Sequence, residues 1–209
     1  MDNKFEEKFK EIHVKAESGD SLAQAYLAQE YSVREQHEEA WHWAYLSAGN
    51  GNAWGLYELG MCYLKGINTE VDLEKAYILF NEAVEKGCPR GYIGLAGIVE
   101  KVSDMYNPEI YRLIAKAVQL GDAKAYYLLG LQYKYGFFVE KSVNNYAYLT
   151  AQAGSKGFAP AFYELACESL PGGILNTNID DAMQFMKFAA HLGFPPAIDY
   201  LEKLDSQNQ

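Results

Sequence analysis

Six glycines recur along this chain at nearly constant spacing. The intervals between them are 32, 36, 34, 36 and 36 residues, and leucine stands eight positions after every one. The glycines are Gly19, Gly51, Gly87, Gly121, Gly157 and Gly193, and the leucines are Leu27, Leu59, Leu95, Leu129, Leu165 and Leu201. A repeat of this length predicts supersecondary units that stack on their neighbours and share one continuous core.

Small residues occupy two further positions of each repeat. The fourth position holds Ala23, Gly55, Gly91, Ala125, Ala161 and Ala197, and the ninth holds Ala28, Gly60, Ala96, Gly130 and Ala166 before ending in Glu202. Glycine inside a helix costs about 1 kcal/mol relative to alanine. Its use at Gly60 and Gly130 predicts that a neighbouring helix approaches closely there.

A second stripe precedes each later glycine. Residues eleven, eight and four positions before it are mostly apolar or small, as Ala76, Leu79 and Ala83 are before Gly87. These offsets share one helical face, so each unit is predicted to be two helices, the second of them capped by the next glycine. The expected N-caps of three second helices are Asp72, Ser142 and Asn178.

The segments "GLYELGMCYLKGINTEVDLEKAYILFNEAVEKG" and "AYYLLGLQYKYGFFVEKSVNNYAYLTAQAGSKG" resemble the Sel1-like repeat, a relative of the tetratricopeptide repeat. The resemblance covers about residues 19–202. It implies an all-α fold, an α/α right-handed superhelix (solenoid) of about five helix-turn-helix repeats that begin near residues 19, 51, 87, 121 and 157. It also implies use as a protein-binding scaffold.

The ends and two loops depart from the pattern. Residues 1–18 are expected to form a capping helix with Phe5, Phe9, Ile12 and Ala16 on one stripe. A final single helix is expected from residue 195 and through residues 197–204, with Glu202 facing water, and residues 203–209 are expected to be a frayed tail. The loop "EYSVREQHEEA" is short and "EKVSDMYNPEI" lacks the loop glycine, so both turns are expected to be altered.

Composition argues against several classes of function. The formal net charge is -10, so nucleic acid is not an expected partner, because phosphate binding needs a positive patch. The charged N-terminus and the lack of a long apolar run favour a cytoplasmic protein with no membrane segment. Cys62, Cys88 and Cys167 show no paired spacing and are expected to be reduced and buried.

No catalytic or metal-binding pattern is present in the sequence. His37 and His42 are five residues apart, which is not the spacing that directs two ligands to one metal, and "GYIGLAG" lies in the first-helix frame with no strand before it. We therefore expect no enzyme activity, no metal and no cofactor. An enzyme whose residues converge from distant repeats stays open.

By analogy with tetratricopeptide solenoids, the first helices should line a concave groove. The third and sixth positions after each glycine would then face a protein or peptide partner, which predicts a site made of Trp54, Tyr57, Arg90, Ile93, Lys124, Tyr127 and Tyr163. The alternative is that the tyrosines pack between units.

A secondary partner site is predicted around the second helix of the first repeat. Trp43 lies on the packing stripe there, whereas Trp41 points elsewhere and is either covered by the N-terminal helix or exposed for binding. Glu35, Glu38 and Glu39 form either a solvated turn or a contact for a basic partner.

The preferred hypothesis is a non-catalytic scaffold or adaptor that binds a protein or peptide in the groove. The alternative is an acidic immunity protein that neutralises a toxin or effector. Because both ends have spare helices, a monomer is expected, with a dimer through one terminal face left open.

Overall fold

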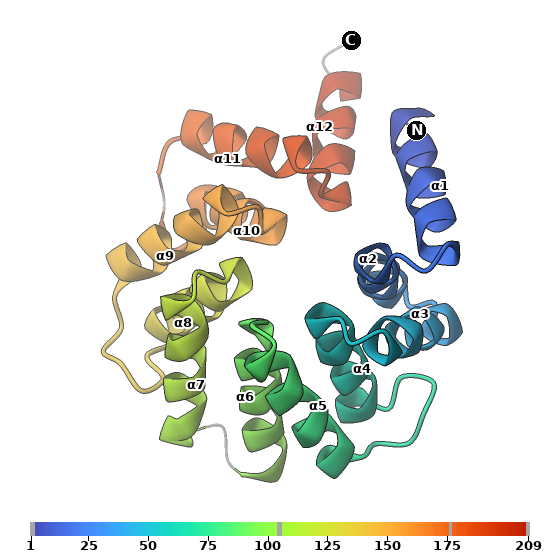
Figure 1. Cartoon of the computed structure of the whole chain (residues 1–209). Helices are drawn as coiled ribbons and strands as arrows, with labels where there is room; N and C mark the ends of the chain where they lie inside the picture. Colours follow the sequence, from blue (N-terminus) through green and yellow to red (C-terminus); the bar gives the residue numbers. More distant parts are fainter. Residues whose placement is uncertain (1–2, 104–105, 176, 208–209) are drawn as a thin grey trace. The chain divides into compact units, whose positions relative to one another are not determined.

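The computed structural model describes residues 3–103, 106–175 and 177–207, with side chains from residue 7 to residue 206. Every regular element in these ranges is a helix (Figure 1). The side chain of Phe5 lies outside the described part. The helices are α1 (Asn3–Glu17), α2 (Ser21–Val33), α3 (His37–Gly49), α4 (Ala53–Lys65), α5 (Leu73–Glu85), α6 (Arg90–Val102), α7 (Pro108–Gln119), α8 (Ala123–Tyr135), α9 (Val143–Ser155), α10 (Ala159–Ser169), α11 (Ile179–His191) and α12 (Pro195–Gln207).

The chain divides into two compact units, Met1–Leu113 and Ile114–Gln209, and the division falls within α7. We call them the N-terminal unit and the C-terminal unit. In the N-terminal unit α2 packs on α3 and α4 packs on α5, while the first helices α2, α4 and α6 also meet one another in sequence order. In the C-terminal unit α8 packs on α9 and α10 packs on α11. Helix pairs are thus the repeating element of both units.

The repeated glycines follow the ends of helices in the left-handed region. Their φ angles lie between +72° and +95°. A Cβ atom added at Gly87 would meet nothing within 4 Å, so the backbone conformation, and not lack of space, explains the glycine there.

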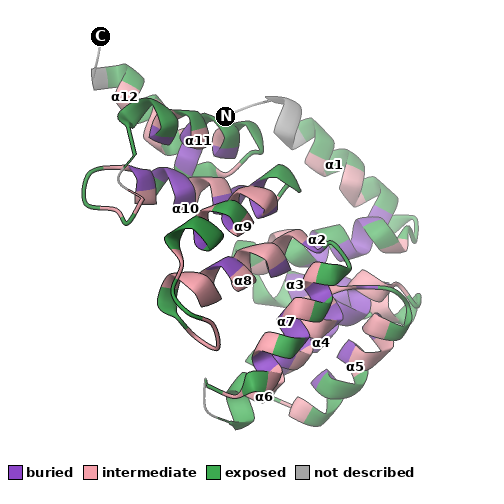
Figure 2. Ribbon diagram, turned by 90° about the vertical axis from the view of Figure 1, so that its left-hand side faces the viewer, coloured by how far each residue is buried: buried purple, intermediate pink, exposed green. Residues whose placement is uncertain are grey.

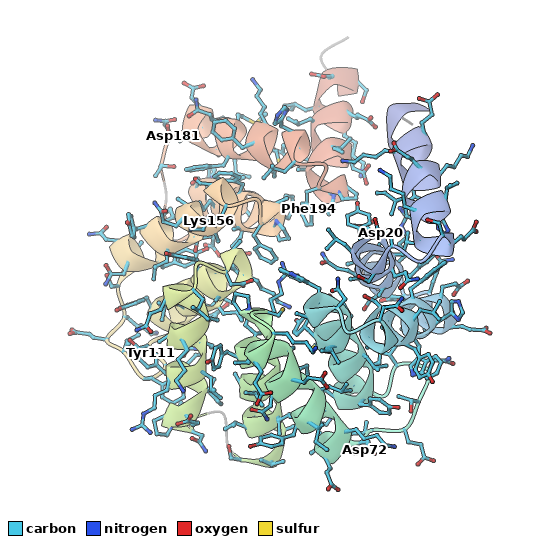
Figure 3. The ribbon with its side chains drawn as sticks, in the orientation of Figure 1. Asp20, Asp72, Tyr111, Lys156, Asp181 and Phe194 are labelled. Carbon is cyan, nitrogen blue, oxygen red and sulfur yellow. The ribbon has the colours of Figure 1, made fainter. Side chains whose placement is uncertain are left out.

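Several helices begin at a residue whose side chain caps the first turn. Asp72, Ser142 and Asn178 accept hydrogen bonds from backbone N–H groups in the first turns of α5, α9 and α11, which confirms the three predicted N-caps. Asp20 caps α2 in the same way, and Figure 3 shows Asp20 and Asp72 at the starts of their helices.

The core of each unit lies where paired helices meet, and buried residues gather on those faces (Figure 2). Leu27, Leu59 and Leu165 are buried, whereas Leu95 and Leu129 are half-buried. The predicted close approach at the ninth position is confirmed: a Cβ atom at Gly60 would lie 2.6 Å from the ring of Phe80, and one at Gly130 would lie 2.8 Å from Thr150 Oγ1.

At the C-terminal helix and at the cysteines the structure differs from two expectations and confirms a third. Helix α12 continues to Gln207, so residues 203–207 are helical and not a frayed tail, while 208–209 lie outside the described residues. Cys167 is exposed, because it faces away from the core on the last turns of α10; Cys62 and Cys88 are buried as expected. Glu202 is exposed, as predicted.

The short loop after α2 bends without a glycine. Glu35 adopts a φ of +58°, in the region that Gly66 takes after α4 with a φ of +74°. No helix in the described ranges combines the length and the apolar character that crossing a membrane would require.

Candidate functional site

Helix α2 presents a row of outward-facing side chains in the N-terminal unit. Leu22, Tyr26, Gln29 and Val33 follow one another at intervals of four, three and four residues, which keeps them on one helical face. Leu22 is 63% exposed and Tyr26 is 39% exposed. Large apolar side chains in such a row are available for contact with another molecule.

Two side chains connect this row to the neighbouring first helices. The guanidinium of Arg90, at the start of α6, lies 4.7 Å from the ring centroid of Trp54 in α4. Arg90 Nη1 also donates a hydrogen bond of 3.2 Å to Gln29 Oε1 in α2. We call Leu22, Tyr26, Gln29, Trp54 and Arg90 the first-helix face. It combines aromatic, aliphatic and cationic groups on α2, α4 and α6, of which α4 packs against both of the others.

Tyr57 does not belong to that surface. Its side chain is only 3% exposed, and its ring lies 5.9 Å from the ring of Phe80. The prediction that Tyr57 contacts a ligand is therefore wrong, and the packing alternative describes it. Ile93, one turn after Arg90, is half-buried.

The remaining predicted groove residues lie in the C-terminal unit, where they are half-buried. The ring of Tyr127 lies 5.3 Å from Phe158, and that of Tyr163 lies 5.2 Å from Phe194, which Figure 3 labels. Burial raises the pKa of Tyr127. Both tyrosines thus pack against the residue that follows the next repeated glycine. Lys124 is half-buried near the start of α8.

A polar cluster joins α8 to α10 in the C-terminal unit. Lys134 Nζ lies 2.7 Å from Glu164 Oε1 and 2.5 Å from Glu168 Oε1. Glu168 Oε2 also accepts a 3.0 Å hydrogen bond from the backbone N–H of Ile174 in the following loop. These contacts hold two helices and a loop together.

Charge and burial oppose each other in this cluster. Burial disfavours the charged form of Lys134, but hydrogen bonds with Glu164 and Glu168 outweigh it, so the pKa of Lys134 is raised. Burial likewise works against ionised Glu168, but the N–H of Ile174 and the ammonium of Lys134 hold its pKa below the ordinary value. The cluster is satisfied internally, and a structural role accounts for it.

A hollow of about 460 Å³ lies at the predicted secondary site. Its lining is Glu38, Glu39, Trp41 and His42 of α3, together with Asn68 of the loop between α4 and α5. Glu35 is exposed and does not line it. We call this feature the α3 hollow.

The two tryptophans of α3 have different environments. Trp41 stacks on Tyr45, with ring centroids 5.1 Å apart and an interplanar angle of 12°. The ring that meets the N-terminal helix is that of Trp43, whose centroid lies 5.8 Å from His13. Trp41 was expected to be either covered by the N-terminal helix or exposed for binding. Its place in the lining of the hollow favours the second alternative.

Sequence reasoning missed four of these residues. Tyr26 and Gln29 could have been found from helical spacing, because Tyr26 stands four residues after Leu22 and Gln29 stands three residues after Tyr26. His42 is adjacent to Trp41 but was considered only as a metal ligand. Asn68 has no signal in the sequence, because it reaches the hollow from a loop that follows the next helix.

No group of three or more His, Cys, Asp and Glu side chains is placed to hold a metal ion in the part of the chain that the structure describes. Polar side chains come together in the Lys134 cluster and in the α3 hollow. Neither pairs a nucleophile with a base in the arrangement that covalent catalysis requires.

Comparison with known proteins supplies the family. The Sel1 repeat model matches residues 21–52, 55–88, 123–149 and 159–194, which together are more than half of the chain. A search of curated proteins gives no significant match.

Solved structures show the same fold. A Sel1 repeat protein from Oxalobacter formigenes is 22% identical, with a TM-score of 0.59 over 90% of this chain and 79% of its own. Two immunity proteins from Pseudomonas aeruginosa are 22% and 21% identical, with TM-scores of 0.59 and 0.56; the alignments cover 76% and 82% of this chain and 59% and 67% of theirs. At these identities the likeness is one of fold, an all-α array of repeated helix pairs.

The six-glycine period, the capped helix pairs and the four matched repeats have one common explanation: the chain belongs to the Sel1 repeat family.

Proposed function

We propose that this chain is a non-catalytic scaffold that binds another protein, and that the first-helix face of the N-terminal unit receives a segment of that partner. The observation that carries the proposal is the arrangement of Arg90 over Trp54 beside the exposed row of α2. Tryptophan, tyrosine and arginine are the residues that contribute most often to the energetic centres of protein interfaces.

The geometry suits an extended or helical peptide more than a small molecule. The face runs across α2, α4 and α6, and none of its residues lines the hollow at α3. Small-molecule sites are concave and enclose most of the ligand. A peptide could place an apolar side chain against Leu22 and Tyr26 and a carboxylate or carbonyl group toward Arg90.

Affinity capture with matched variants tests the proposal. Leu22→Ser combined with Tyr26→Ser removes two exposed side chains from the face, and Arg90→Gln removes its cation in a second variant. Each variant should recover at least about tenfold less of the partner that the wild type retains, because loss of an interface centre costs about 2 kcal/mol or more.

The matched control lies on a second helix of the same unit. Tyr77 and Ile78 of α5 are 56% and 57% exposed. Tyr77→Ser combined with Ile78→Ser therefore removes a similar exposed apolar area away from the first-helix face, and recovery should stay within about twofold of wild type. Equal recovery by all variants, or an equal loss in the control, contradicts the proposal.

A narrower function as an immunity protein is the second candidate. The formal net charge of -10 favours it, since an acidic protein associates rapidly with a basic toxin or effector. Two solved structures with this fold are immunity proteins. Co-expression with a toxin-like protein encoded beside this chain should restore growth if the candidate is right, and continued toxicity at full expression would contradict it.

A further inference from the structure

The α3 hollow lies on a second helix and is separate from the first-helix face. Its lining side chains come from the first turns of α3 and from one residue of the α4–α5 loop. The volume of about 460 Å³ can admit a long side chain from another molecule. What distinguishes the hollow is the combination of two carboxylates with an aromatic wall.

The carboxylates of the hollow have no partner of opposite charge. Glu38 and Glu39 are exposed, and neither accepts a hydrogen bond or forms an ion pair with its side chain among the residues that the structure describes. Some other acids of the unit do have such a partner, as Asp72 has Lys75 at 3.0 Å and Glu82 has Lys86 at 3.8 Å. The hollow therefore presents uncompensated negative charge.

The aromatic wall is held in place by packing. Tyr45 stacks on Trp41, and Trp41 also packs against the buried cluster that contains Trp43 and Leu27. The buried Nε1 atom of Trp41 has no hydrogen-bond acceptor in the described part of the chain. Packing alone thus fixes a flat ring beside two carboxylates.

We propose that the α3 hollow binds the guanidinium group of an arginine presented by a basic protein partner. A guanidinium is flat enough to stack on Trp41 and carries forked N–H donors that suit the carboxylates of Glu38 and Glu39. Lysine offers a point charge without that plane. The inference rests on the proposed function, because the arginine belongs to the bound protein. It further specifies that this protein is basic.

Elsewhere in the N-terminal unit, arginines of the chain itself lie over aromatic rings. The guanidinium of Arg34 lies 4.6 Å from the ring centroid of Phe9, and that of Arg90 lies 4.7 Å from Trp54. Those two arginines are supplied by the chain. At Trp41 the carboxylates and the ring are present, and the partner supplies the arginine.

Nuclear magnetic resonance of the full chain tests the inference with three short peptides. The peptides are acetyl-Gly-Arg-Arg-Gly-amide, its lysine analogue and its citrulline analogue, which keeps the shape of arginine but lacks the charge. The arginine peptide should shift the indole N–H signal of Trp41 and the backbone signals of Glu38, His42 and Asn68. The lysine peptide should bind at least about threefold more weakly, and the citrulline peptide should cause no shift.

Charge variants separate a specific site from general attraction. Glu38→Gln combined with Glu39→Gln should weaken binding of the arginine peptide by about fivefold or more. Glu17→Gln combined with Glu85→Gln removes the same charge from exposed positions outside the hollow and should change binding by less than twofold. Circular dichroism checks that each variant is folded, because acids in the first turn of α3 also stabilise that helix.

The outcomes distinguish this inference from the proposed function. Three results would each overturn the arginine site. They are no shift of the Trp41 signal, equal binding of the arginine and lysine peptides, and an equal loss of binding in the control variant. Such a result leaves the first-helix face intact, since its test uses Leu22, Tyr26 and Arg90. Conversely, the peptide result does not depend on whether the first-helix variants lose their partner.

Discussion

The ring of Phe80 occupies the space that a side chain at Gly60 would need. A Cβ atom there would lie 2.6 Å and 2.8 Å from two carbons of that ring, and Phe80 is fully buried. Gly60→Ala should therefore lower the free energy of unfolding by about 1–2 kcal/mol, since overpacking outweighs the gain in helix propensity. Urea unfolding followed by circular dichroism measures the change.

Two further variants identify the cause. A Cβ atom at Gly49, at the end of α3, would meet nothing within 4 Å, so Gly49→Ala should not lose stability. Phe80→Leu should lower the free energy of unfolding less in the Gly60→Ala background than in the wild type, because the smaller leucine side chain leaves room for the added methyl group. Additive effects would show that the two residues do not compete for the same volume.

The same pair shows what the sequence predicted and what it missed. The period, the helix pairs and the need for small residues at Gly60 and Gly130 were predicted correctly. The stripe of the second helix was predicted correctly at the positions eleven and four residues before each glycine, which are buried, but it was incomplete. Buried side chains also stand seven positions before the repeated glycine, a position outside the predicted stripe, at Ala44, Phe80, Ile114, Thr150 and Met186. Their sizes and polarities differ too much to form a visible pattern.

Surface roles were harder to predict than packing. Periodicity says which face of a helix is buried, but contact between helices far apart in sequence decides what a surface residue touches. Tyr57 was predicted to line a groove, but its ring packs against Phe80. Gln29 belongs to the first-helix face because of its hydrogen bond with Arg90, 61 positions away in the sequence.

Acid should weaken the C-terminal unit through Glu168. Its pKa lies below the ordinary value, so its contribution to stability is complete above about pH 4.3 and is lost as the pH falls through its folded-state pKa. Glu168→Gln should lower stability by about 1–2 kcal/mol at pH 7, and the difference from wild type should shrink by pH 3. Urea midpoints measured between pH 3 and pH 7 check this.

An exposed ion pair provides the comparison for that experiment. Glu82 lies 3.8 Å from Lys86, and the two side chains are 46% and 42% exposed, so Glu82→Gln should change stability by less than about 0.5 kcal/mol at pH 7. If the two glutamine variants follow the same pH profile, the buried contacts of Glu168 are not the cause.

Helix α1 should depend on His13 for its attachment. The Nε2 atom of His13 is hydrogen-bonded to the hydroxyl of Tyr31 at 2.8 Å, and its ring meets Phe9 and Trp43 edge-on. His13→Ala should cost about 1–2 kcal/mol locally and speed hydrogen exchange of α1 amides such as that of Ala16. Amides in α4 should keep their protection.

His42 offers a matched control for that measurement. It is exposed and also meets Trp43 edge-on, with centroids 5.2 Å apart, but no hydrogen bond of its ring is present among the described residues. His42→Ala should leave the exchange of α1 unchanged. Faster exchange in both variants would mean that the environment of Trp43, and not the Tyr31 hydrogen bond, holds α1.

The short loop after α2 should gain stability from a glycine. Glu35 adopts a φ of +58°, which costs a residue with a Cβ atom roughly 1 kcal/mol, whereas glycine accepts it without strain. Glu35→Gly should therefore be about 0.5–1 kcal/mol more stable than Glu35→Ala, which removes the same carboxylate and keeps the strain. Thermal unfolding of the two variants measures the difference. Equal midpoints would mean that the loop relaxes to another conformation when the side chain is cut back, so that the positive φ depends on Glu35 itself.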